Sequence, residues 1–374
     1  MRTYLQEDRA LLETHVPKLD AALADAELAD LERPESPAIQ WFREAGGPAL
    51  FVPEDLGGQG LGLAQAVRLQ RALASRAPSL GVATTMHHFS VASILDLEDT
   101  GTGMEWLLAE AVARNSLLIA SGASEGITGG GLAQPQMTAE PSKDGLLVSG
   151  VKKPCSLSGA MDLLFATVRV LEPEREDRLA LAVIPRDSPG LSVRPFWSTP
   201  VLAGAQSDEV ALEQVFVPAR AIADMGPIGT TADSLRAALV WFELLIAATY
   251  LGICAALLER ALSTPKVSTA LGEVIAEIEG ATYALEAVGM RVDASGRAAS
   301  LIGPALIARC AAERAVTRAA TMAIEALGGR AFISSADVAY LHSASCCLVF
   351  HPPGRRAAAE SIVDFVRGAE VQIA

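Results

Sequence analysis

Apolar residues recur every three or four positions in the first part of the chain. The segments 5–19 and 64–77 both follow this spacing, which predicts amphipathic helices. Between them, residues 51–60 (FVPEDLGGQG) carry Pro and Gly in a pattern typical of a loop. The spacing changes after about residue 116, so we expect a helical N-terminal domain over residues 1–116.

Short β-prone runs replace the helical spacing in the middle of the chain. Gly, Pro, Asp and Ser separate these runs at the intervals expected of a β-sandwich or β-barrel. The runs lie at 117–120, 146–148, 163–170, 179–184, 191–193 and 210–217. Helical spacing then returns and continues to the end. We therefore predict an α+β protein with a middle β domain over residues 117–222 and a helical domain over residues 223–374.

One of the later helical segments is apolar on every side. Between Ala238 and Leu258 the only charged residue is Glu243, and the run is long enough to span a bilayer. However, the sequence has no second run of this kind, and no basic flank follows the positive-inside pattern. A helix that is apolar all round is also what the centre of a large bundle or a subunit interface requires. We predict a buried helix and no membrane span.

Composition and charge narrow the possible partners. The 374 residues are 51% hydrophobic and 20% charged, which excludes a generally disordered chain. A net charge of −14 argues against nucleic acid or an anionic membrane surface as a partner. The five Cys are an odd number, and the charged N-terminus does not resemble a secretory signal, so we expect a reduced, cytoplasmic protein.

Four short segments, together with the order of the domains, carry a resemblance to a known family. They are 53–60 (PEDLGGQG), 121–126 (SGASEG), 150–156 (GVKKPCS) and 325–332 (EALGGRAF). On these segments the chain resembles the acyl-CoA dehydrogenase family over essentially its whole length. The resemblance implies that family's fold, with an N-terminal helical domain, a middle β-barrel and a C-terminal four-helix bundle. It also implies FAD as the cofactor.

Two serines stand where the family contacts the flavin ring. Ser124 lies in the turn after the first strand, where the family places a hydroxyl at the pyrimidine side. Charge accumulates there when flavin is reduced, so a donor stabilises the reduced form. Ser156 matches the family's hydroxyl near flavin N5. Cys155 before it makes the segment more similar to the branch containing dibenzothiophene-desulfurising monooxygenases. The alternative for both segments is an ordinary turn and strand without a ligand.

The third cofactor segment implies contact between subunits. Glu325, Gly328 and Gly329 match a family motif in which a helix ends and its glycines approach the cofactor of another subunit. The resemblance thus implies a homodimer or homotetramer, or an assembly with a homologous partner subunit. The alternative is a simple glycine helix cap. The Arg that pairs with FAD pyrophosphate in the family is absent here, and Lys266 is the nearest substitute, which puts tight FAD binding in question.

The family's usual catalytic base is missing. That base is commonly a Glu nine residues after an Arg, and here His342 replaces the Arg and His351 the Glu. A second family position corresponds to Phe242, with Glu243 one residue and about 100° of helix rotation further on. His351 and Glu243 are therefore the candidate catalytic residues. Each has a structural alternative: a loop His bonded to backbone, and a Glu with a structural hydrogen bond.

Two adjacent histidines are candidates for contact with substrate. His87 and His88 lie on a predicted helix whose family counterpart borders the substrate cavity. Only one of two neighbouring helix residues can face inward, so we expect one of them to contact the substrate. No group of His or carboxylates has the spacing of a metal site, and we predict none.

Three functions remain open at this stage. The first is oxidation of an acyl thioester, bound to CoA or a carrier protein, with hydride transfer to FAD. The second is a reduced-flavin monooxygenase or oxidase on the same scaffold, which the segment 154–156 and the lost Glu favour. The third is a non-catalytic subunit that completes the site of a homologous partner. The first two act on a small molecule.

Overall fold

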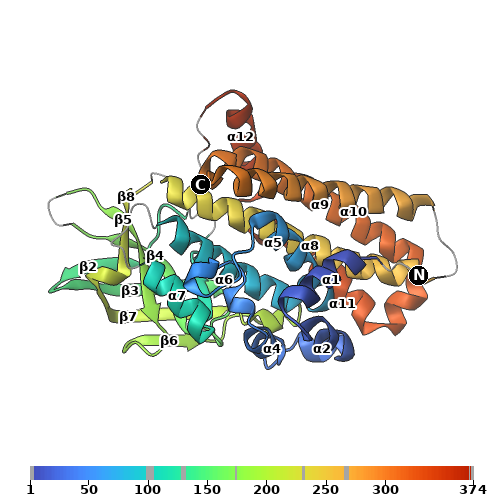
Figure 1. Cartoon of the computed structure of the whole chain (residues 1–374), viewed down its shortest axis with the longest axis horizontal. Coiled ribbons are helices and arrows are strands. Elements are labelled where there is room, and N and C mark those ends of the chain that lie inside the picture. The colour runs from blue at the N-terminus through green and yellow to red at the C-terminus, as the bar shows by residue number, and fades with distance from the viewer. Residues whose placement is uncertain are drawn as a thin grey trace.

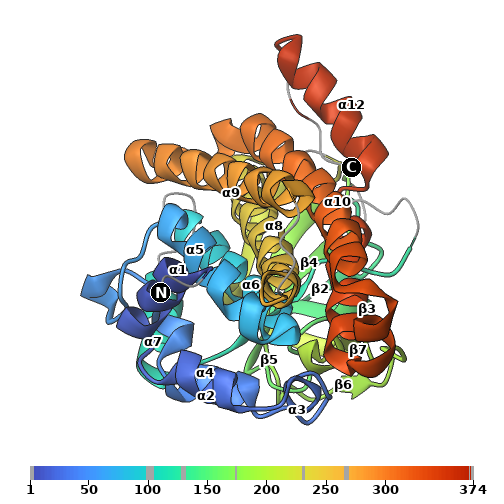
Figure 2. The same ribbon diagram turned by 90° about the vertical axis from the view of Figure 1, so that its right-hand side faces the viewer.

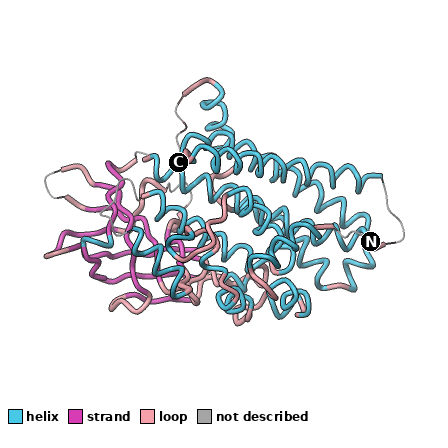
Figure 3. Tube along the Cα trace, viewed as in Figure 1, coloured by secondary structure: helices cyan, strands magenta, loops and turns pink. Residues whose placement is uncertain are grey.

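The protein is elongated, with a sheet at one end and long helices running away from it (Figure 1). Figure 3 shows the same division, with the strands gathered at one end of the trace. The predicted order of helices, strands and helices is therefore observed. The computed structural model describes residues 4–97, 105–127, 132–172, 175–229, 232–264, 269–369 and 371.

The first part of the chain is helical, as its spacing predicts. Pro78 takes the first position of α6, where its missing N–H costs nothing, so α5 and α6 follow each other directly. In the predicted loop, a Cβ on Gly58 would lie 2.0 Å from the carbonyl oxygen of Val52, so the turn closes only on glycine. The elements are α1 (Gln6–His15), α2 (Leu19–Asp25), α3 (Leu28–Leu31), α4 (Ala38–Glu44), η1 (Gly47–Ala49), η2 (Glu54–Leu56), α5 (Leu63–Arg76), α6 (Pro78–Asp96) and α7 (Glu105–Asn115).

The middle of the chain forms one eight-stranded sheet. Its hydrogen-bonded order is β6-β7-β3-β2-β4-β5-β8, and β1 pairs with β4. The β1 and β2 strands both run parallel to β4, while the β3–β7 and β4–β5 pairs are antiparallel. The strands are β1 (Ile119–Gly122), β2 (Thr138–Ser142), β3 (Gly145–Cys155), β4 (Leu163–Val170), β5 (Arg178–Pro185), β6 (Leu191–Arg194), β7 (Asp208–Pro218) and β8 (Ile222–Pro227).

Two strands lie outside the runs predicted from the sequence. The β2 strand contains Glu140 and Pro141 and is mostly exposed, so it lacks the apolar run that marks its neighbours. The β8 strand starts at the expected end of the β domain and extends to Pro227 because it pairs with β5. Helices therefore return only at Asp233, after this additional strand.

The last part of the chain is a helical bundle built around α8. This helix packs against α5 and α6 of the first part and against α9, α10 and α11. The elements are α8 (Asp233–Leu262), α9 (Thr269–Ser295), η5 (Ala298–Leu301), α10 (Ile302–Ser334), α11 (Ala336–Ser345), η6 (Cys346–Phe350) and α12 (Arg355–Val366). In Figure 2, α12 stands away from the body of the molecule.

The apolar segment noted in the sequence forms most of α8. By length and composition this helix could cross a membrane, yet 94% of its most apolar window is buried inside the protein. Its close approach to α5 depends on Gly252, because a Cβ there would lie 2.2 Å from the carbonyl oxygen of Arg71. Most of the apolar surface of α8 is thus covered by neighbouring helices.

Candidate functional site

A cavity of about 1040 Å³ lies where the sheet meets the helices. The sheet, α6, the first half of α8 and the segment 347–360 form its walls. The walls differ in character. Hydroxyl side chains come from the sheet and the loops that leave it, whereas the helices contribute mainly apolar and aromatic side chains. A cavity with one polar and one apolar wall suits a flat ligand with a polar rim.

The two serines predicted at the flavin ring both line this cavity. Ser124 follows β1 and Ser156 follows β3, and the backbone N–H of Lys153 donates to the carbonyl oxygen of Ser124 (2.9 Å), which holds the two segments together. The Ser156 Oγ lies 2.9 Å from the Oγ of Ser207. The Ser124 hydroxyl has no hydrogen-bond partner within the described residues, so it is available to a ligand.

An ion pair supports the polar wall from behind. The Nζ of Lys152 donates to Oε1 of Glu125 (2.7 Å) and to the hydroxyl of Thr167 (3.2 Å). The same carboxylate accepts the backbone N–H groups of Gln136 and Met137. Burial favours neutral Glu125, but Lys152 and these donors prevail and lower its pKa. Burial also lowers the pKa of Lys152, against the pull of Glu125. The pair therefore fixes the turn that carries Ser124.

Cys155, the third predicted cofactor residue of this wall, lies behind it. Its side chain is fully buried, and its thiol donates to the carbonyl oxygen of Ser121 at 3.4 Å. Burial raises the pKa of the thiol to about 12, so it stays protonated. Cys155 therefore packs inside the sheet rather than facing the cavity.

Aromatic rings form part of the helical wall. Phe242 of α8 lies edge-on to Phe89 of α6, with ring centres 5.4 Å apart, and 6.3 Å from His351. His351 lines the cavity, as the sequence predicts for a catalytic candidate. Its Nε2 lies 2.8 Å from the hydroxyl oxygen of Tyr250, which the sequence did not single out. Burial, with a smaller effect of Arg309, lowers the pKa of His351 to about 3, so its ring is neutral.

Glu243, the other catalytic candidate, does not line the cavity. It points to a different side of α8 from Phe242, as the rotation of one residue requires. Its Oε2 lies 3.1 Å from the Nε of Arg309, and both side chains are buried. Burial raises the pKa of Glu243 to about 8, against the opposing effect of Arg309. Within the described residues its oxygens make no hydrogen bond and its polar neighbour is the Arg309 guanidinium, so Glu243 lies outside the cavity without the predicted structural hydrogen bond.

His87 and His88 are also absent from the cavity wall. The Nδ1 of His87 accepts the backbone N–H of Ile119 (3.1 Å), so its Nε2 carries the proton and donates to the carbonyl oxygen of Pro48 (3.0 Å). Burial lowers the pKa of His87 to about 4 and that of His88 well below its usual value. His88 packs edge-on against Phe51. Their positions do not support the predicted substrate contact, and His87 instead joins three chain segments.

The segment expected to approach a partner's cofactor lies on α10, away from the cavity. Glu325 and Gly329 are exposed, and Gly328 has a φ of 77°, which interrupts the helix. A Cβ on either glycine would meet nothing within 4 Å, so this surface is open in the single chain. Their role at a partner's cofactor stays a prediction. Lys266 lies outside the described residues, and no metal-binding group of three ligands occurs among the residues described.

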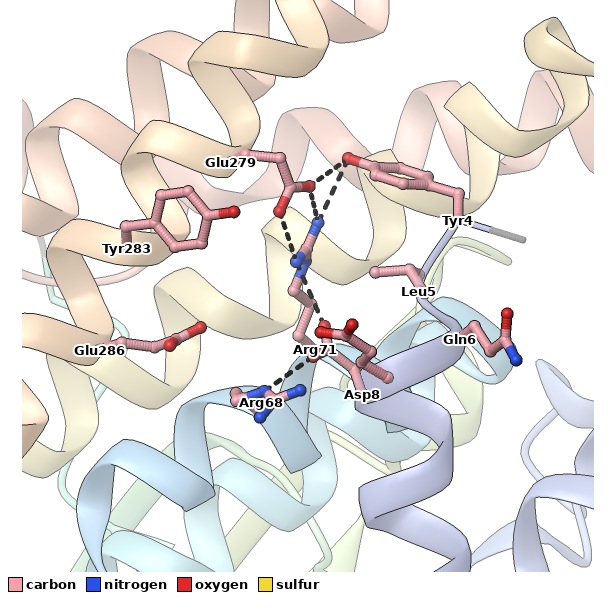
Figure 4. Close-up of a pocket in the computed structure, with 10 residues that line it drawn as sticks. Tyr4, Leu5, Gln6, Asp8, Arg68, Arg71, Glu279, Tyr283 and Glu286 are labelled. Carbon is pink, nitrogen blue, oxygen red and sulfur yellow. Dashed lines mark hydrogen bonds and ion pairs between the residues drawn. The ribbon is translucent and has the colours of Figure 1, made fainter. Parts of the chain in front are cut away.

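A second hollow, of about 510 Å³, lies between α1, α5 and α9 (Figure 4). Arg71 at its centre donates to Oδ2 of Asp8 (3.2 Å) and forms an ion pair with Glu279. Tyr4 donates to the same Glu279 at 2.6 Å, and Arg68 donates to Asp8 at 2.9 Å. Since carboxylates of the protein already hold both guanidinium groups, the network fastens the N-terminal segment to the bundle. Among the described residues of this hollow, neither Arg68 nor Arg71 is left free for a substrate.

Comparison with known proteins identifies relatives that match nearly the whole length of the chain. No protein-family model matches. Isobutylamine N-hydroxylase of Streptomyces viridifaciens is 40% identical over 366 residues, which cover 96% of each chain. A solved structure of KijD3 with FMN and dTDP-3-amino-2,3,6-trideoxy-4-keto-3-methyl-D-glucose has a TM-score of 0.84 and 19% identity, and covers 98% of this chain and 95% of that one. A glutaryl-coenzyme A dehydrogenase complex has a TM-score of 0.80 and 18% identity, and covers 100% and 98%.

These similarities confirm the fold predicted from the four sequence segments. Both solved structures superimpose over nearly their full length, so the helical, β and helical parts keep the same arrangement. At such low identity, the two structures show the fold alone. The relative at 40% identity is close enough over its whole length to show kinship.

Proposed function

Since the chain belongs to the acyl-CoA dehydrogenase family of flavin-dependent oxidoreductases, with similarity to its monooxygenase branch, we propose that it N-hydroxylates a small aliphatic primary amine. In the net reaction, the amine, O₂ and reduced flavin are converted to the hydroxylamine, water and oxidised flavin. One oxygen atom forms the new N–O bond and the other leaves as water. The observation that carries the proposal is the 40% identity, over 96% of both chains, to isobutylamine N-hydroxylase.

The residues of the cavity fit a flavin ring system. The Ser124 hydroxyl, which has no partner among the described residues, and the Ser156–Ser207 pair can hydrogen-bond to a polar ring edge, and the apolar side chains opposite can cover its face. When bound, reduced flavin would supply two of the four electrons that reduce O₂, and the amine nitrogen would supply the other two. In this proposal Ser124 and Ser156 bind and orient the ring, and the Lys152–Glu125 pair keeps Ser124 in place.

The helical wall suits an uncharged amine. Met86, Phe89, Leu239 and Phe242 present hydrocarbon to the cavity. A charged ammonium is disfavoured in such surroundings, so the free base, which carries the lone pair that the reaction needs, is favoured. His351 is neutral at physiological pH and places no like charge beside the amine. In this proposal the imidazole hydrogen-bonds to the amine or to the oxygen being transferred, and Tyr250 holds the ring in position.

The carboxylates of the cavity favour oxygenation over removal of an α-proton. Among the described lining residues, Glu125 is bound by Lys152 and Glu360 by Arg356 at 2.9 Å. Glu243 lies outside the cavity. A dehydrogenase needs a positioned base for the α-proton of its thioester. No described carboxylate of the wall is free for that role.

Thioester oxidation is the second candidate, because His351 lies at the family's base position and does face the cavity. In that reaction its imidazole would take the α-proton while hydride leaves the β-carbon for the flavin. The low pKa of His351 makes it a weak base, which places this candidate second.

The choice between FAD and FMN belongs to the proposal as well. The serines that we place at the flavin contact its ring system, which FAD and FMN share. FAD was predicted from the family resemblance, whereas the KijD3 structure holds FMN. We propose a flavin that binds in its reduced form. Fluorescence titration with each flavin decides between them, and we expect FAD to bind no more tightly than FMN if the adenine half lacks a site.

The decisive experiment supplies reduced flavin and follows the product. The protein is mixed with isobutylamine, a flavin reductase, NADH and either flavin in air, and the mass of the product is measured. We expect the hydroxylamine, one oxygen atom heavier than the amine, and its loss in His351→Gln. His342→Gln, a change in a histidine that does not line the cavity, is the control. Bleaching of bound flavin by acyl-CoA without a reductase, and no hydroxylamine, would favour the second candidate.

Assembly and location stay predictions. We propose a homodimer or homotetramer in the cytoplasm, in which Glu325, Gly328 and Gly329 approach the flavin of another copy. Sedimentation at micromolar concentration tests the assembly, and a monomer that binds flavin as tightly as any larger species would refute the subunit contact. A protein that binds flavin only after mixing with a homologous subunit would instead support a partner-dependent role.

A further inference from the structure

Arg309 is the largest fully buried side chain of the described residues. It lies on α10 and does not line the flavin cavity. A guanidinium group costs much free energy to bury unless its charge is balanced and its N–H groups find acceptors. The proposed reaction does not by itself explain why the protein carries this charge.

The contacts of Arg309 join three parts of the structure. Its Nη2 donates to the carbonyl oxygens of Leu348 (3.2 Å) and His351 (3.0 Å). Its Nη1 donates to Oε2 of Glu313 (2.5 Å) on α10, and its Nε faces Glu243 on α8. One rigid guanidinium thus connects two helices to the segment that carries His351.

The chain around His351 has few other ways to be anchored. The next two residues are Pro352 and Pro353, which have no backbone N–H to donate. The segment can therefore be held through its carbonyl oxygens, and these need a donor from elsewhere. The planar fork of arginine reaches two carbonyls and two carboxylates at once, which a lysine ammonium cannot do.

The ring of His351 has a separate anchor. The Tyr250 hydroxyl, from α8, lies 2.8 Å from its Nε2. Arg309 holds the backbone of the residue and Tyr250 holds the ring, so the two contacts together determine where the imidazole faces the cavity. Neither arginine nor tyrosine is close to His351 in sequence.

Glu313 supplies the principal counter-charge of Arg309. Arg355 binds the other oxygen of Glu313 through Nε (2.8 Å) and Nη2 (2.6 Å). Burial opposes ionisation of Glu313, but Arg355 and Arg309 prevail and lower its pKa, whereas burial raises the pKa of Glu243 against the effect of Arg309. Removing Arg309 together with the ionisable group of Glu243 leaves the Glu313–Arg355 pair complete.

We propose that Arg309 is a positioning residue for His351, and that the Glu313 carboxylate, with the carboxyl group of Glu243 beside the Arg309 Nε, allows it to be buried there. This inference rests on the proposed function only in giving His351 a part in the reaction. It assigns Glu243 a role outside the chemistry and predicts that disturbing Arg309 alters the imidazole before it alters flavin binding.

The test uses the whole protein with ¹⁵N-labelled histidine rings and the double variant Arg309→Met, Glu243→Gln. The spectrum contains five histidines, and His351→Gln identifies the signal of interest. We expect the ring signals of His351 to move toward those of a mobile imidazole and those of His87 to stay. With the amine, kcat should fall about ten-fold, while KM and the flavin Kd change by less than about two-fold. The control is Arg318→Met with Glu277→Gln, an exposed ion pair between α10 and α9, which should shift nothing.

Two further variants keep the inference open to refutation. If the double variant does not fold, Arg309→Lys keeps the charge but loses the fork, and Tyr250→Phe loosens only the ring. We expect a shift of the His351 signals in both. Unchanged His351 signals in folded variants at Arg309 overturn the inference. If the wild-type protein makes no hydroxylamine, the proposed function fails, but the ring signals still decide the positioning role.

Discussion

Glu32 is a buried carboxylate that joins three parts of the molecule near the cavity. Its oxygens accept the backbone N–H of Ser79 at the start of α6 (3.1 Å) and the Ser79 hydroxyl (2.5 Å). Tyr340 of α11 donates to the same carboxylate and accepts the backbone N–H of Leu202, a residue of the cavity wall. The titration of Glu32 therefore bears on how the first helices, the loop at Leu202 and the bundle hold together.

Burial raises the pKa of Glu32 to about 7, although the hydrogen bonds from Ser79 and Tyr340 oppose the rise. The folded protein thus holds a proton that the unfolded chain releases between its ordinary value of 4.5 and about 7. This contribution to stability is complete below pH 4.5 and is lost as the pH rises through 7. At about 1.4 kcal/mol per pKa unit, the loss is about 3 kcal/mol, of which about 2 kcal/mol falls between pH 5.5 and 8.

Replacement of Glu32 by Gln removes the titration and keeps an acceptor for Ser79. We expect the free energy of unfolding of Glu32→Gln, relative to wild type, to rise by about 2 kcal/mol from pH 5.5 to pH 8. Urea unfolding at several pH values measures this difference, and other titrating groups cancel in the comparison. Glu35→Gln, at an exposed position nearby, should give a flat difference. A flat difference for Glu32→Gln as well would refute a proton held by this carboxylate.

Three further expectations concern packing and the polar wall. Gly252→Ala should lower the free energy of unfolding by about 2 kcal/mol, because the new Cβ would clash with the backbone of α5. Gly280→Ala, which places its Cβ in open space on α9, should raise the free energy of unfolding by about 0.5 kcal/mol. Urea unfolding of both variants measures the difference. Lys152→Met should cost about 3 kcal/mol by leaving the Glu125 carboxylate without its cation, and adding Glu125→Gln should recover much of that loss in the same assay. Ser156→Ala should weaken flavin binding about five-fold in fluorescence titration, and unchanged binding would remove this serine from the proposed site.

Much of the fold follows from local patterns. The run 163–170 coincides with β4, and the apolar segment from Ala238 to Leu258 lies inside α8. The strands β2 and β8 escaped prediction because their own residues show no apolar alternation, and only pairing with other strands makes them extended. Contacts of this kind are not encoded within a few residues of the chain.

The residues of the candidate site likewise divide into those that sequence motifs indicated and those whose place only the tertiary structure revealed. Ser124, Ser156 and His351 were found because each lies in a segment that resembles a family motif, and all three line one cavity. Glu243 was named because it lies one residue past the family's second position for the base, but the rotation of α8 turns it toward Arg309. Its partner is 66 residues away, so no local spacing could indicate the pair.

By itself, the sequence of this protein determined the order of helical and β parts, the buried central helix and the segments that resemble a flavoprotein family, because these depend on periodicity and short motifs. The tertiary structure alone decided which polar groups face the cavity and which hydrogen-bond within the protein and stabilise the structure around it. Both ring nitrogens of His87 hydrogen-bond to the backbone of Pro48 and Ile119. Tyr250 lies beside His351, although 101 positions separate the two in the sequence. The reason is that a buried polar side chain must find its partner, and burial brings together residues that the chain keeps far apart.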